Sequence, residues 1–355
     1  MNVFCYFVEP ASYTLDLASN VYSSYKINYC FIKSHSLAFS HSNSNKIFLD
    51  KLSFFKKLHF IFLSFKNNDV IIINGYNNYP FIVIFMLNLF SIKKKSIAID
   101  SDTQLNIPSN PFKRFFKWVY LSFVFQNKYV LGFAGGSAIH KDLFRYYGMK
   151  ENRIFLMPMV VDNQKYYLDN KQFPETFTFL FVGRLIPSKN VDALCEQFIH
   201  YFSEKDVRLI VVGDGESRSD LQKKYSHPRI QFKGSVFGED LVKLYHNSSV
   251  FLFPSLFDAW GLVINEALSS GLPVITHKSV GANYDLVKGK NTGLIASNIN
   301  EFGEQMLELY NNHNLLMTYS KKALYLMKNH WNYNLYAECL NKALKKCEKD
   351  MNITL

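Results

Sequence analysis

Short apolar runs recur along the first half of the chain, separated by longer segments in which apolar residues follow helical spacing. The runs lie at residues 2–8, 27–32, 69–74, 96–100, 128–136 and 153–161. Runs of this length predict buried strands, and helical connections between them predict parallel pairing. The segment SAIHKDLFRYYG predicts a helix ending at Gly148, because glycine favours the left-handed turn beyond a helix. The first half therefore predicts a doubly wound α/β sheet.

The same alternation returns in the second half. Its apolar runs lie at residues 177–183, 208–213, 230–234, 250–255 and 273–277. After the fourth run, a helix is predicted from Gly261 to a stop at Gly271 and Pro273, residue types that commonly end helices. The segment at 332–349 again has helical periodicity.

These patterns predict two α/β lobes of similar build with a ligand cleft between them. With 355 residues, of which 48% are hydrophobic, the chain can bury two cores. We predict a Rossmann-like domain at 1–165, a linker at 166–176, a second Rossmann-like domain at 177–331, and a helical segment at 332–355. The return of this last segment to the first domain is left open.

Composition adds an expectation about the compartment. The five cysteines are scattered and have no CxxC spacing, which favours a reducing cytosol over a disulfide framework or a zinc site. No basic stretch followed by an apolar run opens the chain, so we expect no signal peptide. The longest apolar run, FIVIFMLNLF at 81–90, is shorter than the about 20 residues that a bilayer span needs. It predicts a buried helix, and we expect a cytoplasmic protein.

Nearly all of the net charge of +11 belongs to the first half of the chain. The basic residues concentrate in three segments, at 54–66, 93–95 and 110–123, and they alternate with aromatic residues in the first and the last of these. This pattern suits peripheral contact with an anionic membrane, and a solvated basic face over ordinary core aromatics explains it equally well. Nucleic acid is the competing partner, but no helix-turn-helix, zinc-finger or RRM signature is present, so we expect none.

The stretch FDAWGLVINEALSSGLPVI, at 257–275, carries the clearest chemistry. A helix that starts near Gly261 and Leu262 presents free N–H groups and a positive dipole end to an anion. Asp258 on the preceding loop and Glu266 inside the helix can accept hydrogen bonds from hydroxyl groups. Together these residues predict a ligand with both phosphate and polyol groups, such as a nucleotide sugar. A two-carboxylate hydrolase is the alternative.

A second candidate anion site follows the strand predicted at 177–183. FVGRLIPSKN places Gly183, Arg184 and Lys189 directly after it. The two cations, Arg184 and Lys189, would together neutralise a diphosphate. An ordinary solvated loop is the alternative. VVGDGES at 211–217 lacks the GxGxxG and Walker patterns, so a tight turn is favoured there. The turn that contains Val236 could offer backbone groups to a base edge.

The order of these pieces resembles the donor-binding domain of family 4 glycosyltransferases, which are retaining enzymes with the two-lobed GT-B fold. The resemblance runs through FVGRLIPSKN, LIVVGDGES, IQFKGSV, DLVKLYHNSSVFLFPSLFDAWGLVINEALSSGLPVI and NTGLI, and the final HWNYNLYAECL resembles the family's closing helix. The family's Glu-x7-Glu signature appears here as Asp258 and Glu266, so the first acid is one methylene shorter.

The resemblance also implies roles for these residues. Arg184 and Lys189 would bind the donor diphosphate and stabilise its developing charge. Glu266 would hold the ribose hydroxyls, and Asp258 would contact the sugar. Gly261 and Leu262 would present backbone N–H groups, so that neither a metal nor a further cofactor is required. The catalytic candidates are thus Asp258, Arg184 and Lys189, and the donor-binding candidates add Gly183, Val236, Gly261, Leu262 and Glu266.

In the first half, AIDSDTQ at 98–104 occupies a comparable strand end, where Asp100 or Asp102 could face the acceptor. We expect a retaining transfer of one sugar to a glycan or lipid-linked acceptor in cell-surface polysaccharide synthesis, such as O-antigen or capsule. A non-catalytic nucleotide-sugar-binding subunit and another GT-B enzyme, such as an epimerase, remain alternatives.

Overall fold

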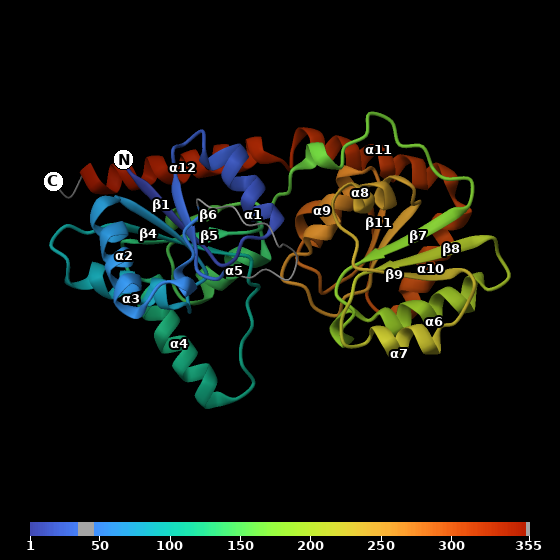
Figure 1. Ribbon diagram of the computed structural model, residues 1–355, viewed down its shortest axis with the longest axis horizontal. Helices are drawn as coiled ribbons and strands as arrows, with labels where there is room; N and C mark the ends of the chain where they lie inside the picture. The colour runs from blue at the N-terminus through green and yellow to red at the C-terminus, as the bar shows by residue number, and fades with distance from the viewer. Residues whose placement is uncertain (35–45, 353–355) are drawn as a thin grey trace. The chain divides into compact units, whose positions relative to one another are not determined.

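All six apolar runs of the first half form parallel strands of one sheet. The computed structural model describes residues 1–34 and 46–352, and its first sheet has the order β2-β1-β3-β4-β5-β6 (Figure 1). The strands are β1 (Val3–Phe7), β2 (Asn28–Phe31), β3 (Val70–Asn74), β4 (Ser96–Ser101), β5 (Val130–Ala134) and β6 (Ile154–Leu156). Strands β1, β3 and β5 are buried on both faces, as expected for a parallel sheet covered by helices.

Helices cover both faces of this sheet. They are α1 (Ser12–Leu17), α2 (Phe54–Asn67), α3 (Tyr79–Phe90), α4 (Pro111–Phe125), α5 (Ile139–Tyr146) and α12 (Tyr333–Asn352). Alternate strand residues such as Tyr6, Ile73 and Ile99 share one core with residues of α2 to α5. On the other face, the hydroxyl groups of Tyr22 and Tyr336 lie 3.0 Å apart. This contact joins α12 to the helical segment Ala18–Tyr22 of the first unit. Figure 1 shows α12 lying over the first unit, although it follows all the other elements in the chain.

The second sheet is also parallel and has the order β12-β11-β10-β7-β8-β9. Its strands are β7 (Phe177–Val182), β8 (Val207–Val212), β9 (Ile230–Gly234), β10 (Val250–Phe253), β11 (Val274–His277) and β12 (Gly293–Ala296). The helices of this unit are α6 (Val191–Phe202), α7 (Arg218–Lys224), α8 (Gly238–His246), α9 (Leu262–Ser269), α10 (Ile299–Asn311) and α11 (His313–Asn329). Each sheet with its helices is therefore a doubly wound α/β unit, as expected from the resemblance to the two-lobed GT-B fold.

The chain divides between the two sheets by its own contacts. The first unit comprises residues 1–159 together with α12, and the second unit comprises residues 160–332. The division thus falls before the segment 166–176 that the sequence suggested as a linker. No helix among the described residues is both long enough and apolar enough to cross a bilayer.

Two sequence-based expectations need correction. The strand β12 was not predicted, because its four residues lie at a sheet edge and are mostly half-buried, so they leave little apolar signal. The predicted helix at 81–90 forms as α3, but it is not buried throughout. Its side chains at Ile82, Met86 and Phe90 are exposed, because α3 contributes only one of its faces to the core.

Candidate functional site

The predicted donor-site residues gather where the strand order of the second sheet reverses. Strands β7, β8 and β9 follow one another in one direction, and β10 begins the other half of the sheet beside β7. Because all the strands are parallel, the loops after β7, β8, β9 and β10 lie at one edge. In such sheets, ligands bind beyond the carboxyl ends of the strands at this switch point.

The loops after β7 and β8 pack directly against each other through their backbones. Gly213 has a φ of 132°, and a Cβ atom there would lie 1.8 Å from the carbonyl oxygen of Gly183. The backbone N–H of Leu185 donates to the carbonyl of Asp214 at 2.8 Å. Any side chain at position 213 would force these loops apart. The glycine thus fixes the position of the backbone on either side of Arg184.

The Asp214 side chain stabilises the turn after β8. Its carboxylate accepts from the N–H of Gly215 at 2.8 Å and pairs with Arg218 at 2.8 Å. The hydrogen bond from Gly215, followed by the hydrogen bond from Arg218, lowers the pKa of Asp214. These contacts support the interpretation of this stretch as a structural turn.

Lys189 and Asp258 form an ion pair at the switch point. Lys189 ends the short 3-10 turn at Pro187–Lys189, and its ammonium group donates to an Asp258 oxygen at 2.5 Å. The Lys189 side chain is only 11% exposed and that of Asp258 is 21% exposed, so the pair is largely shielded from water. The same ammonium lies 3.4 Å from the Ser255 hydroxyl and 5.2 Å from the centre of the Phe253 ring.

Arg184 is exposed at the end of β7. Within residues 1–34 and 46–352, its guanidinium group forms no ion pair. The two cations that were predicted to bind phosphate therefore differ. Lys189 is paired with Asp258, whereas the exposed Arg184 side chain can turn toward a ligand.

Helix α9 begins at this edge behind a glycine. Gly261 is the N-cap residue, with a φ of 97°, and no side-chain hydrogen bond caps the helix start. A Cβ atom at Gly261 would lie 3.3 Å from both Phe253 and Val280, so a larger residue would be strained in conformation and crowded. The Trp260 ring next to it donates from its N–H to the Asn265 side chain at 2.8 Å and stacks on Trp331 at 5.4 Å. The loop between β10 and α9 is therefore anchored where it enters α9.

Glu266 lies one turn into α9 and is held by a tyrosine. The Tyr245 hydroxyl donates to a Glu266 oxygen at 2.8 Å. Burial raises the pKa of the Glu266 carboxyl, while hydrogen bonds from Tyr245 and Tyr166 act in the opposite direction. The carboxylate is thus oriented before any ligand arrives.

The remaining predicted residues of this edge are placed less specifically. Leu262 is the first residue of α9, and Val236 lies half-buried in the loop after β9. Among the described residues, no group of three or more His, Cys, Asp or Glu side chains is placed to hold a metal ion. Of the predicted set, Lys189 and Asp258 are brought into direct contact, and Arg184, Val236 and Glu266 lie at the same edge of the sheet.

In the first unit, Asp100 and Asp102 lie at the end of β4. The Asn74 amide donates to an Asp100 oxygen at 2.7 Å. Burial, with the nearby charge of Asp102, raises the pKa of Asp100 to about 7. Burial and the charges of Asp102, Glu9 and Asp100 also raise the pKa of Tyr13. The charges of three carboxylates thus act on one tyrosine of the first unit.

Several residues at the site escaped the sequence analysis. Tyr245 and Tyr166, which orient Glu266, come from α8 and from the segment before β7. His277 ends β11, and burial followed by the Lys278 charge lowers its pKa. Its ring also forms a hydrogen bond with the Ser255 backbone. The one available signal was the internal acid at Glu266, because a carboxylate inside a half-buried helix needs hydrogen-bond donors.

Comparisons with known proteins agree with this architecture. Residues 176–312, which include every donor-side candidate, match the family described as "Glycosyl transferases group 1". A GDP-mannose-dependent alpha-mannosyltransferase of Mycobacterium tuberculosis is 38% identical over 115 residues, which cover 32% of this chain and 29% of that protein. The Staphylococcus aureus capsular polysaccharide biosynthesis glycosyltransferase CapM is 28% identical over 189 residues, covering 48% and 49%. The matched part thus spans less than half of each of these relatives.

The solved structures extend the likeness to nearly the whole chain. The HepE protein of Anabaena in complex with UDP aligns over 98% of this chain and all of that one, with a TM-score of 0.75 and 14% sequence identity. At this identity the match establishes the fold.

Proposed function

Because residues 176–312 match the family of group 1 glycosyl transferases, we propose that the chain is a retaining glycosyltransferase. It would move one sugar from a nucleoside diphosphate donor to a hydroxyl group of a glycan or lipid-linked acceptor. The observation that carries the proposal is the gathering of Lys189, Asp258 and the start of α9 at the switch point of the second sheet. Phosphate and sugar hydroxyls are the groups that these elements can bind together.

The donor's diphosphate would lie against the second unit. Arg184 offers a planar fork for two phosphate oxygens. The Lys189 ammonium has three N–H donors, and its contacts with Asp258 and Ser255 leave one for a phosphate oxygen. The backbone N–H groups at Gly261 and Leu262 add the positive end of α9. As the bond from sugar to phosphate breaks, negative charge builds on the leaving diphosphate, and these donors stabilise it without a metal.

The acids would hold the two sugars of the donor. Asp258, beside Lys189, would accept from hydroxyls of the transferred sugar. Glu266, oriented by Tyr245, would accept from the ribose hydroxyls. The acceptor would bind at the first unit, where Asp100 and Asp102 end β4. The relatives that act with GDP-mannose and in capsule synthesis support a role in cell-surface polysaccharide assembly.

A lipid-linked acceptor would bring the enzyme to a membrane from its cytoplasmic side. Support comes from α4, whose exposed side chains include Phe112, Phe115, Phe116 and Trp118. Figure 1 shows α4 projecting from the first unit. Lys113, Arg114 and Lys117 lie between these aromatic residues. Apolar side chains that alternate with cations favour contact with an anionic lipid surface.

The donor assignment can be tested with a thermal-shift panel of UDP-, GDP-, ADP- and CMP-sugars. A ligand that binds only the folded state raises the melting temperature, and one of these classes should do so. Arg184→Ala should abolish the shift. Arg208→Ala is the matched control, because Arg208 is exposed near the start of β8, away from this edge. If Arg184→Ala binds the donor as well as the wild type does, the phosphate assignment is wrong.

Product analysis with a labelled donor separates the remaining activities. A glycosyltransferase transfers the label to an acceptor, whereas an epimerase returns it on a nucleotide. A binding subunit alone leaves the donor intact.

A further inference from the structure

An apolar groove runs between α2 and α3 on the first unit. It has a volume of about 520 Å³, within the range of about 300–1,000 Å³ that is usual for ligand sites. Its walls include Phe62 and Phe65 from α2 and Ile82, Val83, Met86 and Phe90 from α3. The groove also includes Ser91, its only polar lining residue. A ligand in it would therefore meet almost no hydrogen-bonding partners.

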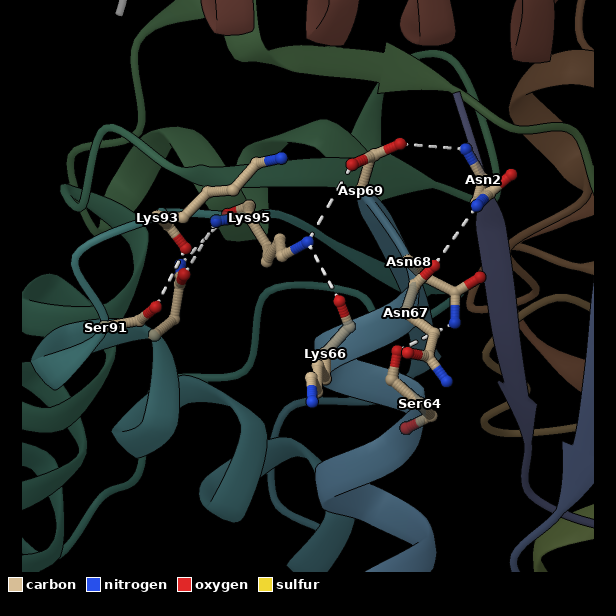
Figure 2. A network of polar contacts seen from close by, with 10 residues as sticks. Asn2, Ser64, Lys66, Asn67, Asn68, Asp69, Ser91, Lys93 and Lys95 are labelled. Atoms are coloured by element: carbon tan, nitrogen blue, oxygen red, sulfur yellow. Dashed lines mark hydrogen bonds and ion pairs between the residues drawn. The ribbon is translucent and has the colours of Figure 1, made fainter.

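Polar contacts hold the two helices at one end of the groove. The Asn88 side chain on α3 donates to the carbonyl of Lys95 at 2.9 Å and accepts from its backbone N–H at 2.8 Å. The Lys95 ammonium donates to the carbonyl of Lys66 at 3.4 Å and lies 3.8 Å from Asp69. Figure 2 shows this network linking the end of α2 to the segment after α3. These contacts tie the end of α2 to the segment after α3, beside the groove.

Exposed lysines lie beside the groove, and Asp69, the acid of the network described above, is already paired with Lys95. Lys66 follows the lining residue Phe65, and Lys93 lies two residues beyond Ser91; both are exposed. The segments 51–68 and 79–99, which include α2 and α3, contain lysines but no Asp or Glu. The surroundings of the groove thus favour an anionic partner.

The chemistry of the lining decides between occupants. A bound peptide or nucleotide would bury polar groups that the groove leaves without partners, which is costly. A second copy of this chain, seated on the same face, would bring lysines against lysines. A hydrocarbon chain needs no hydrogen bonds, and an anionic headgroup would meet the lysines at the Ser91 end. These requirements select a lipid.

We propose that the groove between α2 and α3 takes up one hydrocarbon chain of an anionic membrane lipid, with the headgroup phosphate near Lys66 and Lys93. This inference rests on the membrane contact proposed above and adds to it a defined site for a single chain. The projecting α4 would give broad contact with the bilayer, whereas the groove would hold one lipid molecule in a fixed orientation. The first unit would then be docked at a set angle to the membrane.

The test uses the whole protein and single-chain lipids below their micellar concentration. Binding of lysophosphatidylglycerol, which is anionic, and lysophosphatidylcholine, which is zwitterionic, is measured by native mass spectrometry and fluorescence titration. We expect one lysophosphatidylglycerol per protein and weaker binding of lysophosphatidylcholine. Met86→Glu should weaken binding by about tenfold or more, because it places a charge inside the apolar groove.

Phe55→Glu is the matched control. Phe55 is an exposed apolar residue of α2 that does not line the groove, so this variant should bind within about twofold of the wild type. Met86→Trp is a second variant without added charge, and it should block the groove by filling it. The melting-temperature shift with nucleotide sugar should survive in all three variants. That readout keeps failure of this site distinct from failure of the donor site.

Three results would overturn the inference. Met86→Glu and Met86→Trp could bind the anionic lipid as the wild type does, or many lipids could bind without saturation. Alternatively, the wild type could be a dimer that Met86→Glu converts to monomers while lipid binding is absent. The last result would assign the groove to a second copy of the chain.

Discussion

The Lys189 ammonium and the Asp258 carboxylate lie 2.5 Å apart, although 69 residues separate them in the chain. The pair joins the loop after β7 to the loop after β10, the two strands that flank the switch point of the second sheet. Lys189, which we expect to bind phosphate, and Asp258, which we expect to bind the sugar, thus hold each other in place. Donor binding at this position must occur beside an existing ion pair.

The first prediction concerns the stability of this pair. Asp258→Ala leaves the shielded Lys189 ammonium without its partner, so we expect a loss of about 1–3 kcal/mol in the free energy of unfolding of the second unit. Asp258→Glu keeps the charge and should lose less. The measurement is urea unfolding followed by tryptophan fluorescence in a Trp118→Phe background, because the stacked Trp260 and Trp331 both belong to the second unit. Equal stability of Asp258→Ala and wild type would show that the pair contributes nothing.

The second prediction concerns Glu266 and the pH dependence of donor binding. Burial raises the pKa of this carboxyl, so it begins to take up a proton at a higher pH than an exposed glutamate does. A protonated Glu266 is a poorer acceptor for ribose hydroxyls. We therefore expect donor affinity to fall as pH is lowered toward that raised pKa, as followed by calorimetric titration. Glu266→Gln should bind more weakly at neutral pH and lose this dependence; if it keeps the same profile, another group is responsible.

The third prediction concerns Asp100. Its carboxyl titrates at about 7 in the folded protein, against an ordinary value of 3.8. Between these two pKa values the folded state binds more protons than the unfolded state. The contribution of Asp100 to the free energy of unfolding is therefore fully present below about pH 4 and is lost as pH rises through about 7. Asp100→Asn removes that loss and keeps an acceptor for Asn74. The variant should therefore match the wild type near pH 4 and be more stable above pH 7.

We expect the difference at pH 8 to be about 1–2 kcal/mol, or roughly 2–8 °C in melting temperature. This is less than the full shift would give, because a half-buried carboxylate keeps part of its hydration. Melting curves from pH 4 to 8 provide the measurement. A difference that is the same at every pH would assign the effect to packing instead of titration.

The fourth prediction concerns the proposed membrane contact of α4. A Phe112→Ser and Phe116→Ser double variant should lose most of its flotation with vesicles of phosphatidylcholine and phosphatidylglycerol, because two exposed aromatic anchors are removed. Phe237→Ser and Phe257→Ser form the matched control, since these residues are also exposed but belong to the second unit.

Charge should matter in the same assay. Reversal of charge at Lys56, Lys57, Lys113 and Lys117 should weaken flotation with anionic vesicles, and salt should weaken it further. If flotation depends on neither charge nor the α4 phenylalanines, the proposed membrane contact is wrong.

Periodicity in the sequence was sufficient to predict most of the fold. Eleven apolar runs became strands because a parallel sheet covered by helices buries both faces of each strand, and that burial requires nearly continuous apolar residues. The rule failed for α3, whose apolar residues outnumber those that its packing face can use. Hydrophobicity indicates what a side chain prefers, but the neighbouring elements decide whether it is covered.

The site was predictable in part for a related reason. Gly261 and Glu266 belong to one local stretch, so spacing alone could suggest a helix start with an acid behind it. The Tyr245 hydroxyl that orients Glu266 comes from another helix, and the pairing of Lys189 with Asp258 joins distant loops. Such contacts arise only when the sheet brings strand ends together, and no local pattern records them.

The return of α12 to the first sheet has a consequence for synthesis on the ribosome. Tyr336 reaches Tyr22 only after all of residues 160–332 have been translated. At about 5–20 residues per second, this takes roughly ten to thirty seconds. During that interval, one face of the first sheet lacks its last covering helix while the second unit can already fold. The second unit can therefore finish folding before the first unit does, although the first unit is translated earlier.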